Sequence, residues 1–80
     1  MEKAKYVIVN GSAIVFSAAI KHSEIASKED VQGAGFVTFY STDPDGEVKA
    51  SAHGESFSLG VKSRGQIDSD IISRQILNMY

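Results

Sequence analysis

The sequence has no cysteine, which excludes disulfide bonds and every metal site built on thiolate ligands. It has only two histidines, too few for a closed structural zinc site. A chain of 80 residues is a small domain that buries only about 60–65% of the surface its unfolded form exposes. Small domains without these supports are commonly stabilised by association. We therefore expect a single domain spanning 1–80 that forms a homo-oligomer, most simply a dimer.

The sequence also lacks an excess of basic residues and a long apolar run. It has 8 Lys and Arg against 10 Asp and Glu, for a net charge of −2. This balance gives no general attraction for nucleic acid or for an anionic membrane. The run Ala13–Ile20 is interrupted by Ser17 and is too short to cross a bilayer. We expect a cytoplasmic protein with no membrane partner, and the charge argues against nucleic acid.

The single proline lies in the strongest local signal, Asp43-Pro44-Asp45-Gly46, whose residue types favour a tight turn. The flanking segments alternate and predict strands at 36–42 and 47–53. Pairing across this turn is expected to group Phe36, Thr38, Tyr40, Val48, Ala50 and Ala52 on one face. The opposite face would then carry Val37, Phe39, Ser41, Lys49, Ser51 and His53.

A second hairpin is predicted by Asn10-Gly11, a dipeptide favoured in two-residue hairpin turns. It joins strands expected at 5–10 and 13–19. The register that this turn implies places Val7, Val9, Ile14 and Phe16 on one face. The other face holds Tyr6, Ile8, Ala13, Val15 and Ser17. Both faces are largely apolar, so neither resembles a fully solvated surface.

The rest of the chain predicts one more strand and a helix. Residues 56–62 alternate, with Phe57, Leu59 and Val61 expected to point inward. A helix is expected at 64–78, with an apolar stripe of Ile67, Ile71, Ile72, Ile76 and Met79. Residues 20–32 are expected to form a loop with one or two helical turns. The predicted fold is α+β, in the order ββ(α)βββα, with the C-terminal helix on one face of an antiparallel sheet.

One helix does not cover both faces of five strands, so large apolar side chains are expected to remain on the other face. Such a leftover patch commonly marks an interface. The candidate interface or stacking residues are Tyr6, Ile8, Val15, Phe36, Phe39 and Tyr40. The leading hypothesis is a small non-catalytic binding or accessory protein that acts as a homo-oligomer. A sheet face or an edge strand would form the contact, and another protein is a possible partner.

An alternative hypothesis is a sheet that binds single-stranded nucleic acid. Gln32–Phe39 resembles the octamer on the third strand of RNA-recognition-motif domains, which reads basic-Gly-aromatic-Gly/Ala-Phe-Val-x-aromatic. The resemblance covers eight residues. It implies that exposed aromatic side chains stack on bases. Gln32 and Ala34 stand where that pattern has a basic and an aromatic residue, and a Pro-Asp-Gly turn follows where that family has a helix.

A third hypothesis is a binder of phosphate or carboxylate ligands at the loop before the helix. Lys62, Arg64 and Gly65 lie there, and backbone N–H groups at a helix start attract anions. The acidic cluster Asp43, Asp45 and Glu47 is accounted for by turn chemistry, so no metal is expected. The sequence predicts no cofactor and no catalytic residue, since the spacing of His22 and His53 indicates no nucleophile–base pair.

Overall fold

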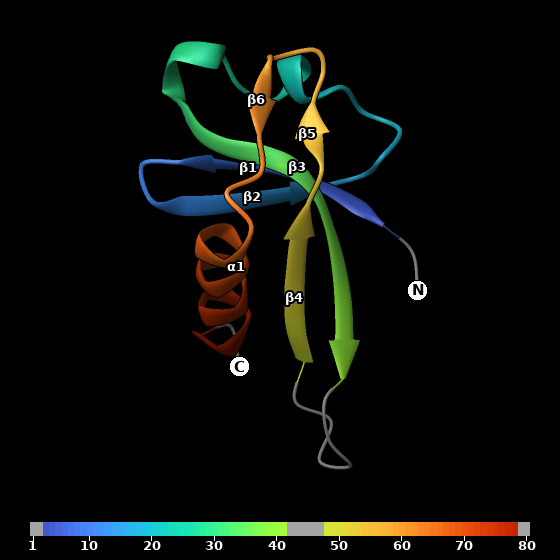
Figure 1. Ribbon diagram of the computed structural model, residues 1–80, viewed down its shortest axis with the longest axis vertical. Helices are drawn as coiled ribbons and strands as arrows, with labels where there is room; N and C mark the ends of the chain where they lie inside the picture. The colour runs from blue at the N-terminus through green and yellow to red at the C-terminus, as the bar shows by residue number, and fades with distance from the viewer. Residues whose placement is uncertain (1–2, 42–47, 79–80) are drawn as a thin grey trace.

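The computed structural model describes residues 3–41 and 48–78, so the predicted turn at 43–46 and the acidic cluster lie outside the described residues. It confirms the α+β class. A four-stranded antiparallel sheet in the order β2-β1-β3-β4 is accompanied by a two-stranded sheet, β5-β6, and one helix (Figure 1). The elements are β1 (Ala4–Val9), β2 (Ser12–Phe16), η1 (His22–Glu24), η2 (Lys28–Asp30), β3 (Val31–Ser41), β4 (Val48–His53), β5 (Glu55–Ser56), β6 (Val61–Lys62) and α1 (Gln66–Asn78).

The β1–β2 hairpin has the predicted register. Val7 pairs with Ile14, and Ile8 pairs with Ala13. Asn10 and Gly11 both have positive φ, 52° and 76°, as a type I′ turn requires. The dipeptide therefore fixes the faces of both strands, although β2 ends at Phe16, three residues before the predicted end of that strand.

Strand β3 is longer than predicted and pairs with a different strand along each of its two halves. Its first part pairs with β1 and its last part with β4, and Figure 1 shows β4 running crosswise to β1 and β2. It begins at Val31 rather than at residue 36. Gly33 and Gly35, expected to precede the strand, lie inside it at close approaches. A Cβ at Gly33 would overlap the Asp68 carboxylate, and one at Gly35 would lie 2.5 Å from the His53 carbonyl oxygen.

The predicted pairing of β3 with β4 is wrong by one residue. Val37 pairs with Ala52 and Phe39 with Ala50, whereas Phe36 pairs with His53. A slip of one residue moves every side chain of a strand to the other face. The observed register buries Val37 with the two small alanines beneath α1. It places Phe36, Thr38 and Tyr40 with Lys49, Ser51 and His53 on the face away from the helix.

The predicted strand at 56–62 is also wrong. The structure has two short strands, β5 and β6, separated by a turn in which the Gly60 N–H donates to the Ser56 carbonyl at 2.8 Å. Leu59 is buried as expected, but Phe57 is 87% exposed. The helix begins at Gln66, two residues later than predicted. No helix in the described ranges is long and apolar enough to cross a membrane.

The chain itself covers parts of both sheet faces. On the α1 side, Ile72 packs against Tyr6, Ile8 and Val37 in the main core. On the opposite side, Leu59 packs against Val7 and Ala34. Partly buried side chains from the segment after η1 and from β6 complete that second cluster, among them Ile25, Ala26 and Val61. The connections between strands therefore fold back over part of the second face and bury Val7, whereas Ile14 on the same face stays 43% exposed.

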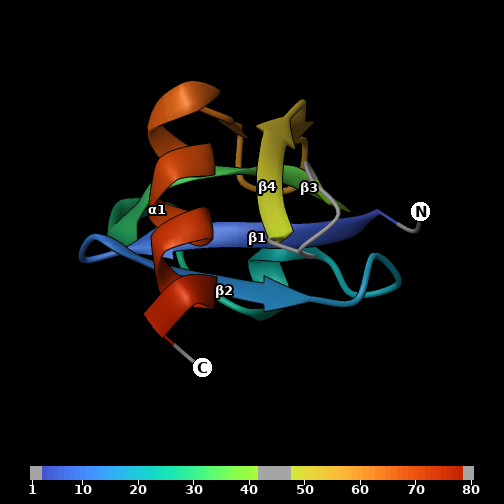
Figure 2. The same cartoon turned by 90° about the horizontal axis from the view of Figure 1, so that it is seen from below.

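Side chains of helix α1 form hydrogen bonds with backbone groups on both edge strands of the sheet. Figure 2 shows the helix reaching from β4 to β2. On β4, the N–H groups of Ala50 and Ala52 donate to the hydroxyls of Ser73 and Ser69, at 3.0 and 2.8 Å. On β2, the Gln75 amide pairs with both the N–H and the carbonyl of Ala13. Edge groups that would otherwise accept another strand are thus bonded within the chain.

Candidate functional site

The structure separates the six residues predicted to form an interface. Tyr6 and Ile8 are fully buried beneath α1, so the chain's own helix occupies the surface that they were expected to offer. Val15 and Phe39 lie on the same face beyond the helix. They line an open hollow together with Lys3, Ala4, Phe16, Ser17 and Ala18. Val15 is 41% exposed there.

The remaining two residues, Phe36 and Tyr40, lie on the opposite face of the sheet. The ammonium groups of Lys3 and Lys5 each lie 6.0 Å from the centroid of the Phe36 ring. A cation at this distance is attracted to the face of an aromatic ring. The His53 ring stacks on the same phenylalanine, with centroids 6.4 Å apart. This face therefore combines aromatic rings with cations.

A pocket of about 250 Å³ opens beside Phe36. Its walls come from four parts of the chain: β1, the segment around η1, β3, and β5 with the turn that follows it. The lining residues are Lys5, Lys21, His22, Phe36, Glu55, Phe57 and Ser58. The N–H of Ser23 donates to the Ser58 hydroxyl at 3.2 Å, which holds two of these walls together.

His22 forms the inner wall of the pocket and is almost completely buried. Its Nε2 lies 2.8 Å from the Gly35 carbonyl oxygen. Because a carbonyl only accepts, Nε2 carries the proton and Nδ1 keeps a free lone pair. The ring meets Phe16 and Phe36 edge to face, with centroids 5.5 and 6.0 Å apart. Burial lowers the pKa of His22, which keeps the imidazole neutral.

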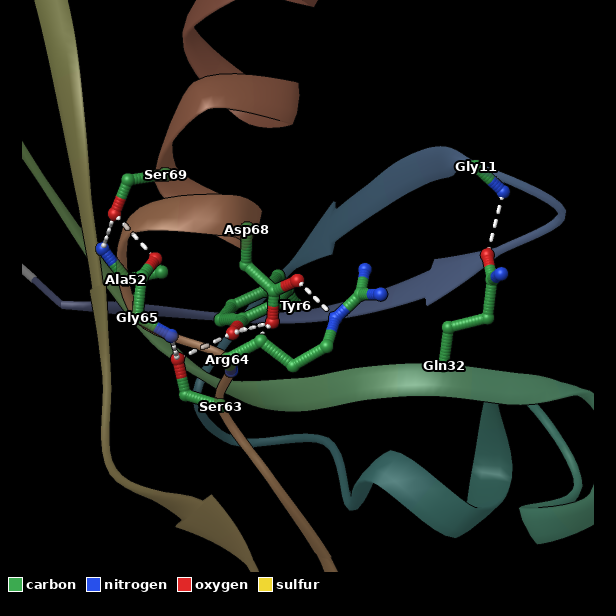
Figure 3. Close-up of polar contacts among 9 residues, drawn as sticks. All are labelled: Tyr6, Gly11, Gln32, Ala52, Ser63, Arg64, Gly65, Asp68 and Ser69. Atoms are coloured by element: carbon green, nitrogen blue, oxygen red, sulfur yellow. Dashed lines mark hydrogen bonds and ion pairs between the residues drawn. The ribbon is translucent and has the colours of Figure 1, made fainter.

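Two of the three residues of the predicted anion site, Lys62, Arg64 and Gly65, already bond within the protein, and Figure 3 shows the Asp68 carboxylate beside Arg64. The backbone N–H and the Nε of Arg64 donate to Asp68, at 2.9 and 2.7 Å. The Gly65 N–H donates to the Ser63 hydroxyl at 3.1 Å. Lys62 is exposed on β6, across from Glu55. Asp68 thus takes two donors of Arg64, and Ser63 takes the Gly65 N–H, whereas Lys62 stays exposed. Anion binding at this loop stays a prediction.

Asp68 is completely buried and joins three segments of the chain: β1, the loop before α1, and α1 itself (Figure 3). The Tyr6 hydroxyl donates to its Oδ2 at 2.6 Å, and the Ser63 hydroxyl lies 2.7 Å from the same phenol oxygen. Burial raises the pKa of Tyr6, and the hydrogen bond to Asp68 adds to that shift. The cluster is satisfied by its own hydrogen bonds and has a structural role.

Within the described ranges, no three His, Asp or Glu side chains come close enough together to hold a metal ion. Each imidazole has one nitrogen near a protein group: His53 Nε2 lies 3.1 Å from the Thr38 hydroxyl, and His22 Nε2 donates to the Gly35 carbonyl. The pocket therefore offers aromatic walls, two lysines, a carboxylate and a neutral imidazole. These groups suit the binding of a planar anionic ligand.

No family model, curated protein or solved structure matches this chain. The candidate site consequently rests on its geometry alone. Sequence reasoning missed Lys5, Lys21, His22, Glu55 and Phe57 as residues of one pocket. The alternation of β1 could have placed one of these residues on the correct face, because Lys5 shares a face with Val7 and Val9. Nothing in the sequence signalled that Phe57 would point into solvent.

Proposed function

We propose that this protein is a non-catalytic binding protein that holds single-stranded nucleic acid on the sheet face opposite α1. The observation that carries the proposal is the Phe36 ring with the ammonium groups of Lys3 and Lys5 each 6.0 Å from its centroid. Proteins that bind single strands combine aromatic rings, on which bases stack, with cations that follow the backbone. Both kinds of group are present here.

The distribution of charge supports this proposal better than the net charge does. Lys5 and Lys21 line the pocket beside Phe36, and the Lys3 ammonium lies 6.0 Å from the centroid of the same ring. Lys49 lies on the same face, opposite Tyr40. Of the acidic residues, Asp68 and Asp70 belong to α1 on the other side of the sheet, whereas Glu55 lines the pocket itself. The net charge of −2 sums over the whole chain. A ligand instead responds to the electrostatic potential near the surface that it approaches.

The test is a fluorescence anisotropy titration with a labelled, mixed-sequence oligonucleotide of about 10 nucleotides, within the range of sites of this class. We expect binding that weakens as salt is raised, because lysines displace counterions from phosphates. Phe57→Ala should weaken binding about tenfold, since base stacking contributes about 1–3 kcal/mol.

The matched control for charge is a pair of single changes, Lys21→Gln beside the pocket and Arg74→Gln on the exposed side of α1. Both remove one positive charge, but we expect only the first to weaken binding. Equal losses in the two variants, or the absence of salt-dependent binding by the unchanged protein, would reject the proposal.

Self-association is a second candidate function, supported by the outer half of β2. Ile14 and Val15 are 43% and 41% exposed on opposite faces of this edge strand, beside the hollow that also contains Phe39. Gln75 bonds to Ala13 only, one residue earlier. Pairing of two copies along β2 would bury these side chains.

Light scattering over a concentration series tests self-association. A dimer that Val15→Lys converts to a monomer would support pairing through β2. A monomer at every concentration would reject it without bearing on nucleic-acid binding, because the two surfaces lie on different parts of the sheet. The cytoplasmic location stays a prediction from the sequence.

A further inference from the structure

We infer that the pocket between Phe36 and Phe57 binds one phosphorylated nucleotide unit, either the end of a strand or a free mononucleotide. This inference rests on the proposed function and names the part of the ligand that enters the pocket. Three features of the pocket support the inference: its size, the polar groups that line it and the hydrogen bonds that fix its walls.

The size of the pocket limits its occupant. Its volume of about 250 Å³ is below the roughly 300–1,000 Å³ of sites that enclose drug-sized ligands. A small ligand with one planar ring system and an attached polar group suits this volume. Phe36 and Phe57 supply the aromatic surface for that ring, and Phe57 is 87% exposed and hence available to it.

The polar groups of the pocket match both ends of a nucleotide. The ammonium groups of Lys5 and Lys21 are donors for a phosphate. The Glu55 carboxylate is an acceptor for N–H groups of a base or for hydroxyls of a sugar. A ligand that carried only a phosphate would leave Glu55 without a partner and place it near a like charge. A ligand with both an anionic group and hydrogen-bond donors uses all three residues.

His22 adds a second acceptor. Its Nε2 donates to Gly35, so Nδ1 has a lone pair to offer. Among the described residues, every side-chain nitrogen or oxygen that is fully removed from solvent has a hydrogen-bond partner. No hydrogen bond to Nδ1 is found among those residues, and His22 lines the pocket. A base edge with an N–H donor would meet this nitrogen.

The walls are held in place before any ligand arrives. Lys5 donates to the Ile20 carbonyl at 2.9 Å, which fixes its ammonium group at the pocket while leaving it two further protons. The Ser56 hydroxyl accepts from the Leu59 N–H at 3.2 Å and so fixes the turn that carries Phe57. Sites that are already ordered lose less entropy when they bind.

The experiment is a competition measurement. A labelled oligonucleotide is bound to the protein and then displaced by nucleoside 5′-monophosphates, unphosphorylated nucleosides, inorganic phosphate or phosphotyrosine. We expect a monophosphate to displace the strand at least about tenfold more effectively than its nucleoside or inorganic phosphate does, as loss of a charge-assisted hydrogen bond predicts. A strand phosphorylated at one end should also bind more tightly than the same strand without that phosphate.

Two variants separate the pocket from the rest of the face. Lys21→Gln should abolish the advantage of the phosphate, whereas Lys49→Gln removes the same charge from the same face outside the pocket and should preserve it. Both lysines are exposed, and circular dichroism melting of each variant checks that its fold is kept.

The outcomes distinguish this inference from the proposed function. If strands bind equally with and without a terminal phosphate and monophosphates do not displace them, the pocket inference is overturned and strand binding stands. If monophosphates bind directly but oligonucleotides do not, the pocket inference stands and strand binding fails. Displacement by phosphotyrosine that exceeds displacement by every nucleotide would overturn the assignment to nucleotides.

Discussion

The Tyr6 hydroxyl lies 2.6 Å from Oδ2 of Asp68, although 62 residues separate the two in the chain. Both side chains are completely buried. The contact joins the first strand of the sheet to the start of the helix. A carboxylate in the interior is tolerated only when it is paired and hydrogen-bonded, and here Arg64 completes that requirement.

We predict that Asp68→Ala lowers the free energy of unfolding by about 3 kcal/mol, the lower end of the range for breaking a buried pair, because Arg64 still reaches solvent. Chemical denaturation measures this change. The matched control is Asp70→Ala, an exposed carboxylate on the same helix, expected to change stability by at most about 0.5 kcal/mol. Similar losses in both variants would contradict a special role for the buried carboxylate.

We predict that stability falls as the pH rises above 10.0, the ordinary pKa of a tyrosine. Burial and the hydrogen bond to Asp68 raise the pKa of Tyr6, so the folded state keeps a proton that the unfolded state releases. This stabilisation is fully present below pH 10.0 and is lost above it. Denaturation at several alkaline pH values should show this slope, and Tyr6→Phe should flatten it. An unchanged slope in that variant would contradict the assignment.

We predict a matching loss of stability at acidic pH. Burial lowers the pKa of His22 below its ordinary value of 6.5, so the unfolded state binds a proton that the folded state does not. This contribution is present above pH 6.5 and decreases as the pH falls below it. His22→Gln should remove it, whereas His53→Gln on the same sheet face should leave it intact. The measurement is the denaturation midpoint between about pH 5 and 8, where histidine titrates.

We predict that Ser69 and Ser73 protect the β4 edge. Four residues of a helix rise about 6 Å, close to the roughly 6.7 Å between alternate residues of a strand, so two serines match two alanine amides. Ser69→Ala should cost about 1–3 kcal/mol, because the buried Ala52 N–H loses its partner. Amide hydrogen exchange of Ala52 should accelerate, whereas Ser51→Ala, at an exposed position on β4, should leave it unchanged. Unchanged exchange in the Ser69 variant would contradict edge protection.

The parts of the fold that the sequence predicts correctly are encoded locally. Asn10-Gly11 has the backbone preferences of a type I′ turn, and this alone sets the register of β1 with β2. The C-terminal helix follows from its apolar spacing, and Ile72 is buried as that spacing predicts. Ile67, predicted in the same stripe, is instead 56% exposed at the start of the helix, and Met79 lies outside the described residues. In each case neighbouring residues determine the result.

The errors arise where distant contacts decide. The β3–β4 register depends on which face of β4 the helix covers. Small alanines alternate with polar residues along β4. The segment that connects the two strands is too long to fix their pairing. The predicted strand at 36–42 leaves Gly33 outside, whereas Gly33 lies inside β3, where Asp68 approaches the backbone. Phe57 alternates with Leu59 and Val61 as in a strand, yet a tight turn places it in solvent.

The candidate site was found only in part for the same reason. Phe36 was predicted as a stacking residue, but the lysines around it come from β1 and from the segment before η1. These lysines lie together near Phe36 because the connection between β2 and β3 folds back over the sheet. No spacing in the sequence expresses this arrangement.

The most direct test of the proposed binding face is a titration of isotope-labelled protein with a single-stranded oligonucleotide, followed by two-dimensional NMR. We predict that the largest shifts fall on backbone amides of Lys21, His22, Phe36 and Phe57, and that amides near Val15 and Phe39 stay unchanged. Shifts confined to the hollow beside β2, or no shifts at strand concentrations far above the protein concentration, would contradict the assignment of this face to nucleic acid.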